Sequence, residues 1–216
     1  MTDRLNKIFA VLPTCEVFAD IGCDHGYMAK AMLDGGKCKK AIISDVSAKC
    51  LLKAQTLLAR YIKDGKVESA ISDGFDGVGK CDLALIAGMG GEEICSIIER
   101  AKIENKLPQS LVIQPMKNCD KARICAVKAG YAIKYDRVFK SGAKFYNLIV
   151  LVTGKDNLTD EEIEFGRDNV NNPSVEFKEM VGDTYAKLCA LLESSELSKT
   201  VRTEIEEKIK KLKKYV

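Results

Sequence analysis

The chain has 216 residues, of which 46% are hydrophobic and 30% charged, and a formal net charge of +3. This length suits one full α/β domain with a small addition, and the composition excludes wholesale disorder. No stretch is apolar enough to span a membrane, and residues 1–10 lack the apolar run of a signal peptide. We therefore expect a cytoplasmic protein that acts as a monomer.

The nine cysteines and the single histidine argue against both disulfides and a metal site. The cysteine number is odd, most cysteines lie in apolar runs, as Cys81 and Cys125 do, and no pair has the Cys-x-x-Cys spacing. We expect buried free thiols and no structural metal ion.

Short apolar runs alternate with helical patterns over the first part of the chain. The runs predict strands buried on both faces, at residues 17–19, 41–44, 83–87 and 111–113. Helical spacing lies between them, at residues 27–33, 48–61 and 92–98. Repeated strand–helix–strand units predict a parallel sheet with helices on both faces.

The pattern changes after Gly130. Residues 132–139 and 145–153 are two strand-like runs joined by a short turn, which predicts an antiparallel hairpin at the sheet edge. A nicotinamide-binding fold more often continues with parallel units. We place a boundary at residues 154–158, which divides the chain into segments 1–155 and 156–216.

The second segment shows only helical patterns. Apolar residues recur at spacings of three and four in two stripes, Leu188, Leu191 and Leu192, then Leu197, Val201, Ile205, Ile209 and Leu212. With Ser194 and Ser195 between them, the stripes predict an antiparallel helical hairpin or coiled coil, and one continuous helix is the alternative. The first segment is the basic one, with 24 Lys and Arg against 17 Asp and Glu, whereas the second has 10 against 14. This asymmetry permits a polyanionic partner without requiring one.

The most informative stretch is residues 17–26, where a buried strand runs into a tight loop and then a helix. Asp20, Gly22, Asp24 and Gly26 form the pattern Asp-x-Gly-x-Asp-x-Gly, which differs in spacing and charge from the dinucleotide fingerprint Gly-x-Gly-x-x-Gly. Glycine lets the backbone approach a ligand at the carboxyl edge of the sheet. We interpret this segment as a ligand-binding loop.

The charge of this loop separates the ligands that it can hold. Asp20 and Asp24 would repel a pyrophosphate but attract the ammonium and sulfonium of S-adenosylmethionine. The sign of the charge therefore favours S-adenosylmethionine as the cofactor. The alternative is that the two carboxylates only cap the following helix, which explains neither glycine.

Further acids lie after the next strand and in a later turn. Asp45 ends the run 41–44, about twenty residues after the loop, where a carboxylate can accept hydrogen bonds from ribose hydroxyls. Asp73-Gly74-Phe75 is an Asp-Gly turn that adds a further candidate acid. A plain surface turn is the alternative there. Gly88-Met89-Gly90-Gly91 follows the run 83–87, and its glycines predict room for a base beside the methyl donor.

Together these motifs resemble the bacterial TrmK family, the tRNA (adenine(22)-N1)-methyltransferases. The resemblance rests on Asp20-Ile21-Gly22-x-Asp24-His25, Asp45-Val46, Asp73-Gly74 and Ala87-Gly88-Met89-Gly90-Gly91, with Arg4-Leu5, Gln114-Pro115 and Tyr146. It covers most of the chain, including the tail, which the family carries as a coiled-coil-like domain. The Gly-Met-Gly-Gly loop stands where many adenine methyltransferases have Asn/Asp-Pro-Pro-Tyr/Phe, so the loop has no aromatic residue to stack on the target base.

The resemblance implies a Rossmann-like class I methyltransferase fold, that is, an α/β fold whose seven-stranded, mostly parallel sheet ends in an antiparallel hairpin. Residues 1–155 would bind S-adenosylmethionine, and the helical residues 156–216 would place a tRNA. The cofactor-binding residues that we expect are Asp20, Gly22, Asp24, His25, Gly26, Asp45, Val46, Asp73, Gly74, Phe75, Ala87 and Gly88. The substrate-binding residues that we expect are Arg4, Lys7, Gln114, Pro115, Arg123 and Tyr146.

The implied reaction is methyl transfer to N1 of an adenine in the D arm of tRNA. Neutral N1 already has a lone pair, so catalysis can rest on positioning and electrostatics. We expect Asp24 and the backbone of Gly88, Met89, Gly90 and Gly91 to orient the adenine or offset the charge that forms on it. His25 invites a general-base role, and helix capping or cofactor packing are its alternatives.

Several cations are candidates for contact with phosphates, namely Arg4, Lys7, Arg123 and the lysines at 117, 121, 140 and 144. A solvated surface explains most of them equally well. At the level of the whole chain, the alternatives are a methyltransferase for rRNA or a small molecule, and a noncatalytic RNA-binding protein.

Overall fold

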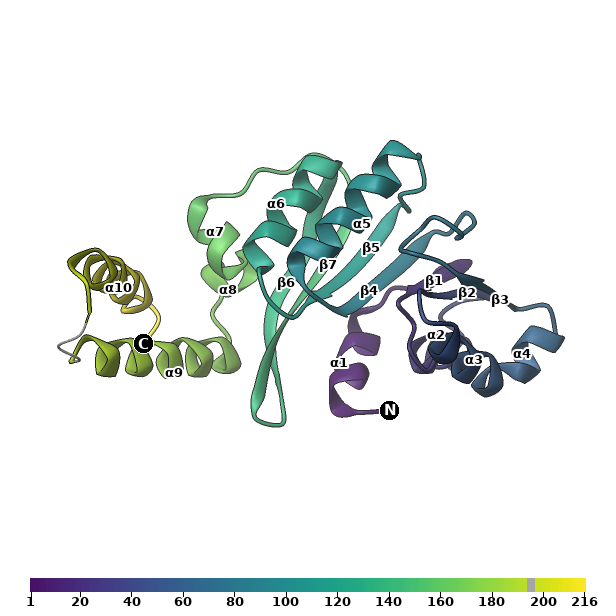
Figure 1. Cartoon of the computed structure of the whole chain (residues 1–216), viewed down its shortest axis with the longest axis horizontal. Coiled ribbons are helices and arrows are strands. Elements are labelled where there is room, and N and C mark those ends of the chain that lie inside the picture. Colours follow the sequence, from purple (N-terminus) through teal and green to yellow (C-terminus); the bar gives the residue numbers. More distant parts are fainter. Residues whose placement is uncertain (194–196) are drawn as a thin grey trace.

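The computed structural model describes residues 1–193 and 197–216. Its centre is a seven-stranded sheet with the order β3-β2-β1-β4-β5-β7-β6, in which only β7 runs against its neighbours (Figure 1). The strands are β1 (Val17–Ile21), β2 (Lys40–Asp45), β3 (Val67–Ile71), β4 (Leu83–Met89), β5 (Ser110–Pro115), β6 (Tyr131–Ser141) and β7 (Lys144–Thr153). The predicted mostly parallel sheet with a final hairpin is confirmed.

Helices cover both faces of the sheet, because successive residues of each buried strand point to opposite faces (Figure 1). In β1, Phe18 contributes to the core under α1 (Asp3–Val11), α2 (Tyr27–Asp34) and α3 (Ala48–Leu57), and Ala19 to the core under α5 (Gly91–Ile103) and α6 (Cys119–Ala129). The short α4 (Ala59–Lys63) follows α3. This two-sided burial explains the unbroken apolar runs of the central strands.

The chain after β7 is helical and packs against the edge strand β6 (Figure 1). It consists of α7 (Asp160–Phe165), α8 (Arg167–Asn171), α9 (Val175–Leu192) and α10 (Lys199–Leu212). Side chains of this segment supply acceptors to β6: Asp156, Asp168 and Asn169 accept hydrogen bonds from the amides of Ile133, Asp136 and Val138, at 2.8, 2.7 and 3.1 Å. The tail is therefore joined to the sheet by hydrogen bonds that are buried or partly buried.

The helices α9 and α10 lie side by side beyond β6, in an antiparallel arrangement (Figure 1). Tyr215, just after α10, packs edge-on against Phe177 in the first turn of α9 at a ring distance of 5.2 Å, while Arg202 near the start of α10 donates to Leu192 O at the end of α9. Two antiparallel helices therefore replace the alternative of one continuous helix. The predicted turn residues Ser194 and Ser195 lie outside the described residues.

No helix in residues 1–193 and 197–216 is long and apolar enough to cross a membrane. The nine cysteines are free thiols, of which Cys23, Cys38 and Cys125 are buried and the other six are half-buried, so the expectation of buried thiols is met only in part.

Candidate functional site

Two adjoining cavities open at the carboxyl ends of β1, β2 and β4. The smaller, of about 100 Å³, lies beside the first turn of α2, and the larger, of about 310 Å³, extends over the ends of β2 and β4. Arg4, Gly22, Asp24 and Ala87 line both. The predicted acidic loop therefore lies at the junction of the two cavities.

The backbone of this loop takes left-handed conformations at three positions, Gly22 and Gly26 with φ of 71° and Asp24 with φ of 50°. Gly22 faces both cavities, and a side chain there would collide with the methyl group of Met89. Gly26 is different: it is buried, it lines neither cavity, and a Cβ there would meet Ala54 of α3. Our assignment of Gly26 to the cofactor is therefore corrected, because its lack of a side chain serves the packing of α2 on α3.

Asp20 is a buried carboxylate in the wall of the smaller cavity. It accepts a hydrogen bond from the amide of Ala29 in the first turn of α2, at 3.2 Å, so part of the capping alternative is realised. No ion pair to Asp20 is found among the residues that the structure describes. Burial raises its pKa from the ordinary value of 3.8 to about 7, and the neighbouring Asp45 adds to the shift. A buried acid without a cationic partner suits a positively charged ligand.

The raised pKa of Asp20 predicts that this residue destabilises the free protein as the pH rises. The folded protein holds the proton up to about pH 7, whereas the unfolded chain loses it near 3.8, so Asp20 lowers the free energy of unfolding progressively between these values. The difference in free energy of unfolding between Asp20→Asn and the unmodified protein should shift in favour of the variant by about 2–3 kcal/mol from about pH 5 to about pH 8. Urea unfolding at both pH values checks this, and a difference that does not change with pH would contradict it.

Asp45 lies at the end of β2 and is 9% exposed. One of its carboxylate oxygens accepts from the amide of Asp24 at 3.0 Å, and the other from the amide of Ser47 at 2.8 Å. Asp45 thus fixes the loop that follows β1 while it lines the larger cavity. Val46 beside it is 68% exposed at the rim of the same cavity and offers an apolar contact there.

His25 joins two charged neighbours. Its Nδ1 lies 2.8 Å from Oδ2 of Asp24, and its Nε2 lies 3.2 Å from Nζ of Lys53. A lysine ammonium only donates, so Nε2 accepts a hydrogen bond from Lys53. Nδ1 then carries the proton and donates a hydrogen bond to Asp24. The acceptor nitrogen of His25 is therefore already used.

The Asp-Gly turn forms the far wall of the larger cavity. Ser72, Asp73 and Gly74 line it, and Oδ1 of Asp73 pairs with Nη2 of Arg100 at 2.8 Å. Phe75 is 2% exposed, lines neither cavity and packs in the core beneath α5. Its assignment to the cofactor is corrected, since the turn directs its ring away from the cavity.

The four residues of the Gly-Met-Gly-Gly segment divide between two tasks. Gly88 and Met89 end β4 and line the larger cavity, with φ of 83° at Gly88. Gly91 is buried, its amide donates to Lys117 O at 2.8 Å, and a Cβ there would lie 2.1 Å from Asn118 O. Gly90 caps α5 outside the cavities. The expectation that Gly91 contacts a base is corrected, because its amide binds Lys117 O and the space beside its Cα is filled by the backbone of Asn118.

Three of the predicted substrate residues lie together beside the cavities, where Arg4 contacts both Gln114 and Tyr146. The Arg4 guanidinium donates to Oε1 of Gln114 and lies 5.8 Å from the ring centre of Tyr146. Gln114 and Pro115 are buried at the end of β5, so neither presents a surface to a substrate, and this part of their assignment is corrected. Gln114 instead contacts Arg4, which lines both cavities.

Arg123 is fully buried, so the expectation that it contacts phosphate is wrong. Its guanidinium holds Asp136 through two hydrogen bonds of 2.7 and 2.9 Å and also donates to Asn147 and to the carbonyls of Ile163 and Glu164. Of the other candidates, Lys7 donates to Lys140 O. Lys7 also pairs with Asp3, Lys121 with Glu92 and Lys140 with Glu179, which leaves Arg4, Lys117 and Lys144 without an ion pair among the described residues.

The cavities also contain residues that were not among the predicted site residues. These are Leu5, Ile21, Cys23, Tyr27, Met28, Ser72, Leu85, Glu93 and Ile97. Residues 1–193 and 197–216 hold no group of three His, Cys, Asp or Glu side chains that is arranged to bind a metal ion.

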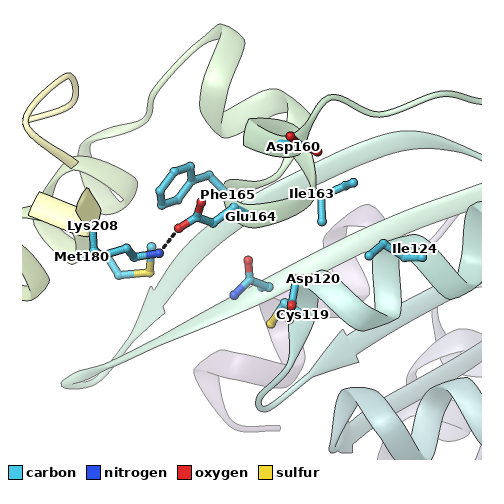
Figure 2. A pocket seen from close by; sticks show the side chains of 10 residues that line it. Cys119, Asp120, Ile124, Asp160, Ile163, Glu164, Phe165, Met180 and Lys208 are labelled. Carbon is cyan, nitrogen blue, oxygen red and sulfur yellow. Dashed lines mark hydrogen bonds and ion pairs between the residues drawn. The ribbon is translucent and has the colours of Figure 1, made fainter. Parts of the chain in front are cut away.

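A separate cavity of about 650 Å³ lies between the sheet edge and the tail (Figure 2). Asp120, Asp160 and Glu164 contribute carboxylates to its wall, and Lys208 of α10 points toward Glu164, with which it pairs. None of the predicted site residues lines it. Its acids disfavour an anion such as phosphate.

The fold and the site define a Rossmann-like methyltransferase, with an acidic loop after β1, an acid after β2 and a glycine-rich end of β4. Residues 1–149 match the family model described as a methyltransferase domain, and the chain belongs to this family.

Within the family, the chain is 26% identical over 156 residues to the tRNA (adenine(22)-N(1))-methyltransferase of Bacillus subtilis, which covers 71% of this chain and 66% of that enzyme. The crystal structure of the B. subtilis TrmK enzyme has the same fold, with a TM-score of 0.85 at 22% identity over 100% of this chain and 98% of the other. M. capricolum TrmK, solved in complex with S-adenosyl-homocysteine, is 25% identical, with a TM-score of 0.87 over 100% and 97% of the two chains. These comparisons confirm the resemblance inferred from the motifs.

Proposed function

We propose that this chain is an S-adenosylmethionine-dependent tRNA (adenine(22)-N1)-methyltransferase that acts as a cytoplasmic monomer. The observation that carries the proposal is the acid-lined double cavity, in which Asp20, Asp24 and Asp45 face the ends of β1 and β4. Relatives that match this chain over most of its length are named for this activity or hold the product of this cofactor.

The residues of the double cavity fit the parts of the cofactor. Asp20 and Asp24 would attract its ammonium and sulfonium, and Asp45 would accept hydrogen bonds from the ribose. Val46, Asp73 and Gly74 line the larger cavity, where an adenine ring would have both an apolar wall and a carboxylate. The bound cofactor supplies an electrophilic methyl group on its sulfonium.

The protein has little proton chemistry to perform. N1 of adenine is a nucleophile in its neutral form, so the site must orient the base, exclude water and offset the positive charge that forms on the methylated ring. Asp24 lies at the junction of the cavities and can serve this last purpose. Because N1 lies on the Watson–Crick edge, the base must leave its pair before it enters.

The tail from Asp156 onward would help to place the tRNA. The antiparallel pair α9 and α10 lies beyond the sheet edge at β6, away from β1 and β2 (Figure 1). Of the lysines near its end, Lys210 and Lys213 have no ion pair among the described residues. Lys117 and Lys144, two of the predicted phosphate contacts, have no ion pair among the described residues and are candidates for phosphate contact.

Methylation of unmodified tRNA, followed by digestion and chromatographic mass spectrometry, tests the function. The expected product is 1-methyladenosine, and a transcript that carries guanine in place of adenine 22 should gain no methyl group. N6-methyladenosine, or methylation of rRNA with tRNA left unmodified, would overturn the proposal.

Asp45→Ala should weaken cofactor binding without unfolding the protein. The variant loses the ribose acceptor and the contacts to the amides of Asp24 and Ser47, so affinity for S-adenosylhomocysteine should fall by about 10- to 100-fold. Asp45→Asn keeps the shape and one acceptor oxygen and should lose less. Calorimetric titration with circular dichroism as a folding control measures this, and unchanged affinity in Asp45→Ala would remove the residue from the site.

A further inference from the structure

The acidic residues of the smaller cavity can bind only the positive charge of the proposed cofactor's amino-acid part. The amino-acid part of the proposed cofactor is a zwitterion, whose ammonium suits Asp20 and Asp24 but whose carboxylate needs a cation. Arg4 is the one lysine or arginine in the described lining of either cavity. It comes from α1, far in sequence from the acidic loop.

The surroundings of Arg4 hold its guanidinium at the cavity and leave donors free. The buried Gln114 donates from its amide nitrogen to Pro115 O at 3.1 Å, which turns its Oε1 toward Arg4. Tyr146 contacts the guanidinium through its ring, at 5.8 Å from the ring centre. One Arg4 nitrogen lies only 3.6 Å from the position that a Cβ on Gly88 would take. No carboxylate pairs with Arg4 within residues 1–193 and 197–216.

We infer that Arg4 binds the carboxylate of the cofactor's methionine part, while Gln114 and Tyr146 hold the guanidinium in place. A guanidinium has five N–H donors, of which Gln114 takes one, so a fork remains for a carboxylate. This inference rests on the proposed function and moves Arg4 from the tRNA phosphates to the cofactor. It also gives α1 a task, which is to bring a cation to the wall of the smaller cavity beside α2.

Arg4 can be tested with two ligands that differ only in the carboxylate. S-adenosylhomocysteine carries it, and S-adenosyl-3-thiopropylamine, its decarboxylated analogue, does not. Arg4→Ala should weaken the first by about 10- to 100-fold in calorimetric titration and change the second by less than about twofold. Arg4→Lys keeps the charge without the fork and should fall between. Arg60→Ala, an exposed arginine on α4, is the matched control and should bind both ligands as the unmodified protein does.

The outcomes separate this inference from the proposed function. Equal losses for both ligands in Arg4→Ala and Arg4→Lys would mean that Arg4 only supports the fold, and no loss for either ligand would return it to the tRNA; each result overturns the inference while the function stands. Failure of the unmodified protein to bind S-adenosylhomocysteine would overturn the proposed function and the inference together.

Discussion

Asp24→Ala is expected to lower turnover on tRNA by about 100-fold, the scale of losing one preorganised electrostatic contact to a developing charge. Asp24 lines both cavities, and its amide is held by Asp45, so its position is fixed from the end of β2. Its side chain remains 66% exposed, which leaves one face of the carboxylate open to a bound base.

His25→Ala should be much milder, with turnover reduced by less than about tenfold. The lone pair of His25 Nε2 is already taken by Lys53 at 3.2 Å, and N1 of adenine has no proton to give up. Single-turnover rates at saturating cofactor and tRNA measure both variants. A His25→Ala protein that binds both substrates normally yet is wholly inactive would sink the mechanism, as would an Asp24→Ala protein with full activity.

Arg123→Ala is expected to reduce the free energy of unfolding by about 3–5 kcal/mol, because it leaves Asp136 as an uncompensated buried charge. Both side chains are fully buried, and the guanidinium also joins Asn147 of β7 to two carbonyls at the end of α7. Gly166 admits this arrangement, since a Cβ there would lie 2.6 Å from Oδ1 of Asp136.

The double variant Arg123→Met with Asp136→Leu provides the control. Replacing both members of a buried ion pair by apolar side chains of similar volume is often neutral, so this protein should be clearly more stable than Arg123→Ala. Urea unfolding followed by circular dichroism at one fixed pH compares the three proteins. A loss in free energy of unfolding of under about 1 kcal/mol in Arg123→Ala would contradict this expectation, because exposed ion pairs contribute that little.

The same contacts bear on where the tail can be removed. A chain that ends at Lys155 would lack the carbonyl partners of Arg123 as well as the side-chain acceptors for β6, so we expect it to be unstable rather than merely poor with tRNA. The side-chain acceptors for the amides of β6 come from residues 156–169, before α9 begins.

The sequence predicts the strands that are buried on both faces and the loop that follows the first of them. The strand β3 was not located, because its residues Glu68, Ser69 and Ile71 are exposed at the sheet edge and form no apolar run. The helix α1 was missed for a similar reason, since only Ile8 of this helix is fully buried.

For the site, nearness in sequence predicts which segment reaches the cavity but not which side chains face it. Asp20, Gly22 and Asp24 line the cavities. Gly26 belongs to the same motif and Phe75 to the Asp-Gly turn, but Gly26 packs against α3 and the ring of Phe75 lies in the core. Other cavity residues, such as Tyr27, Glu93 and Ile97, lie on helices and belong to no motif that would predict a binding role.

Arg123 shows the reverse error, in which a charge is taken for a surface residue. Its partner Asp136 lies on a strand predicted only from its apolar neighbours, so their pairing could not be anticipated. Burial of a cation depends on a partner that folding brings near, and that information is tertiary.

The side-chain acceptors that the tail supplies to the amides of β6 have a consequence for how the protein is made. An open strand edge is a template on which another chain can add a strand and start aggregation. Here the amides of Ile133, Asp136 and Val138 are satisfied by residues that leave the ribosome after the whole sheet has been synthesised. The nascent protein therefore passes through an interval in which its sheet is complete and its edge unguarded, and residues 156–169 end that interval.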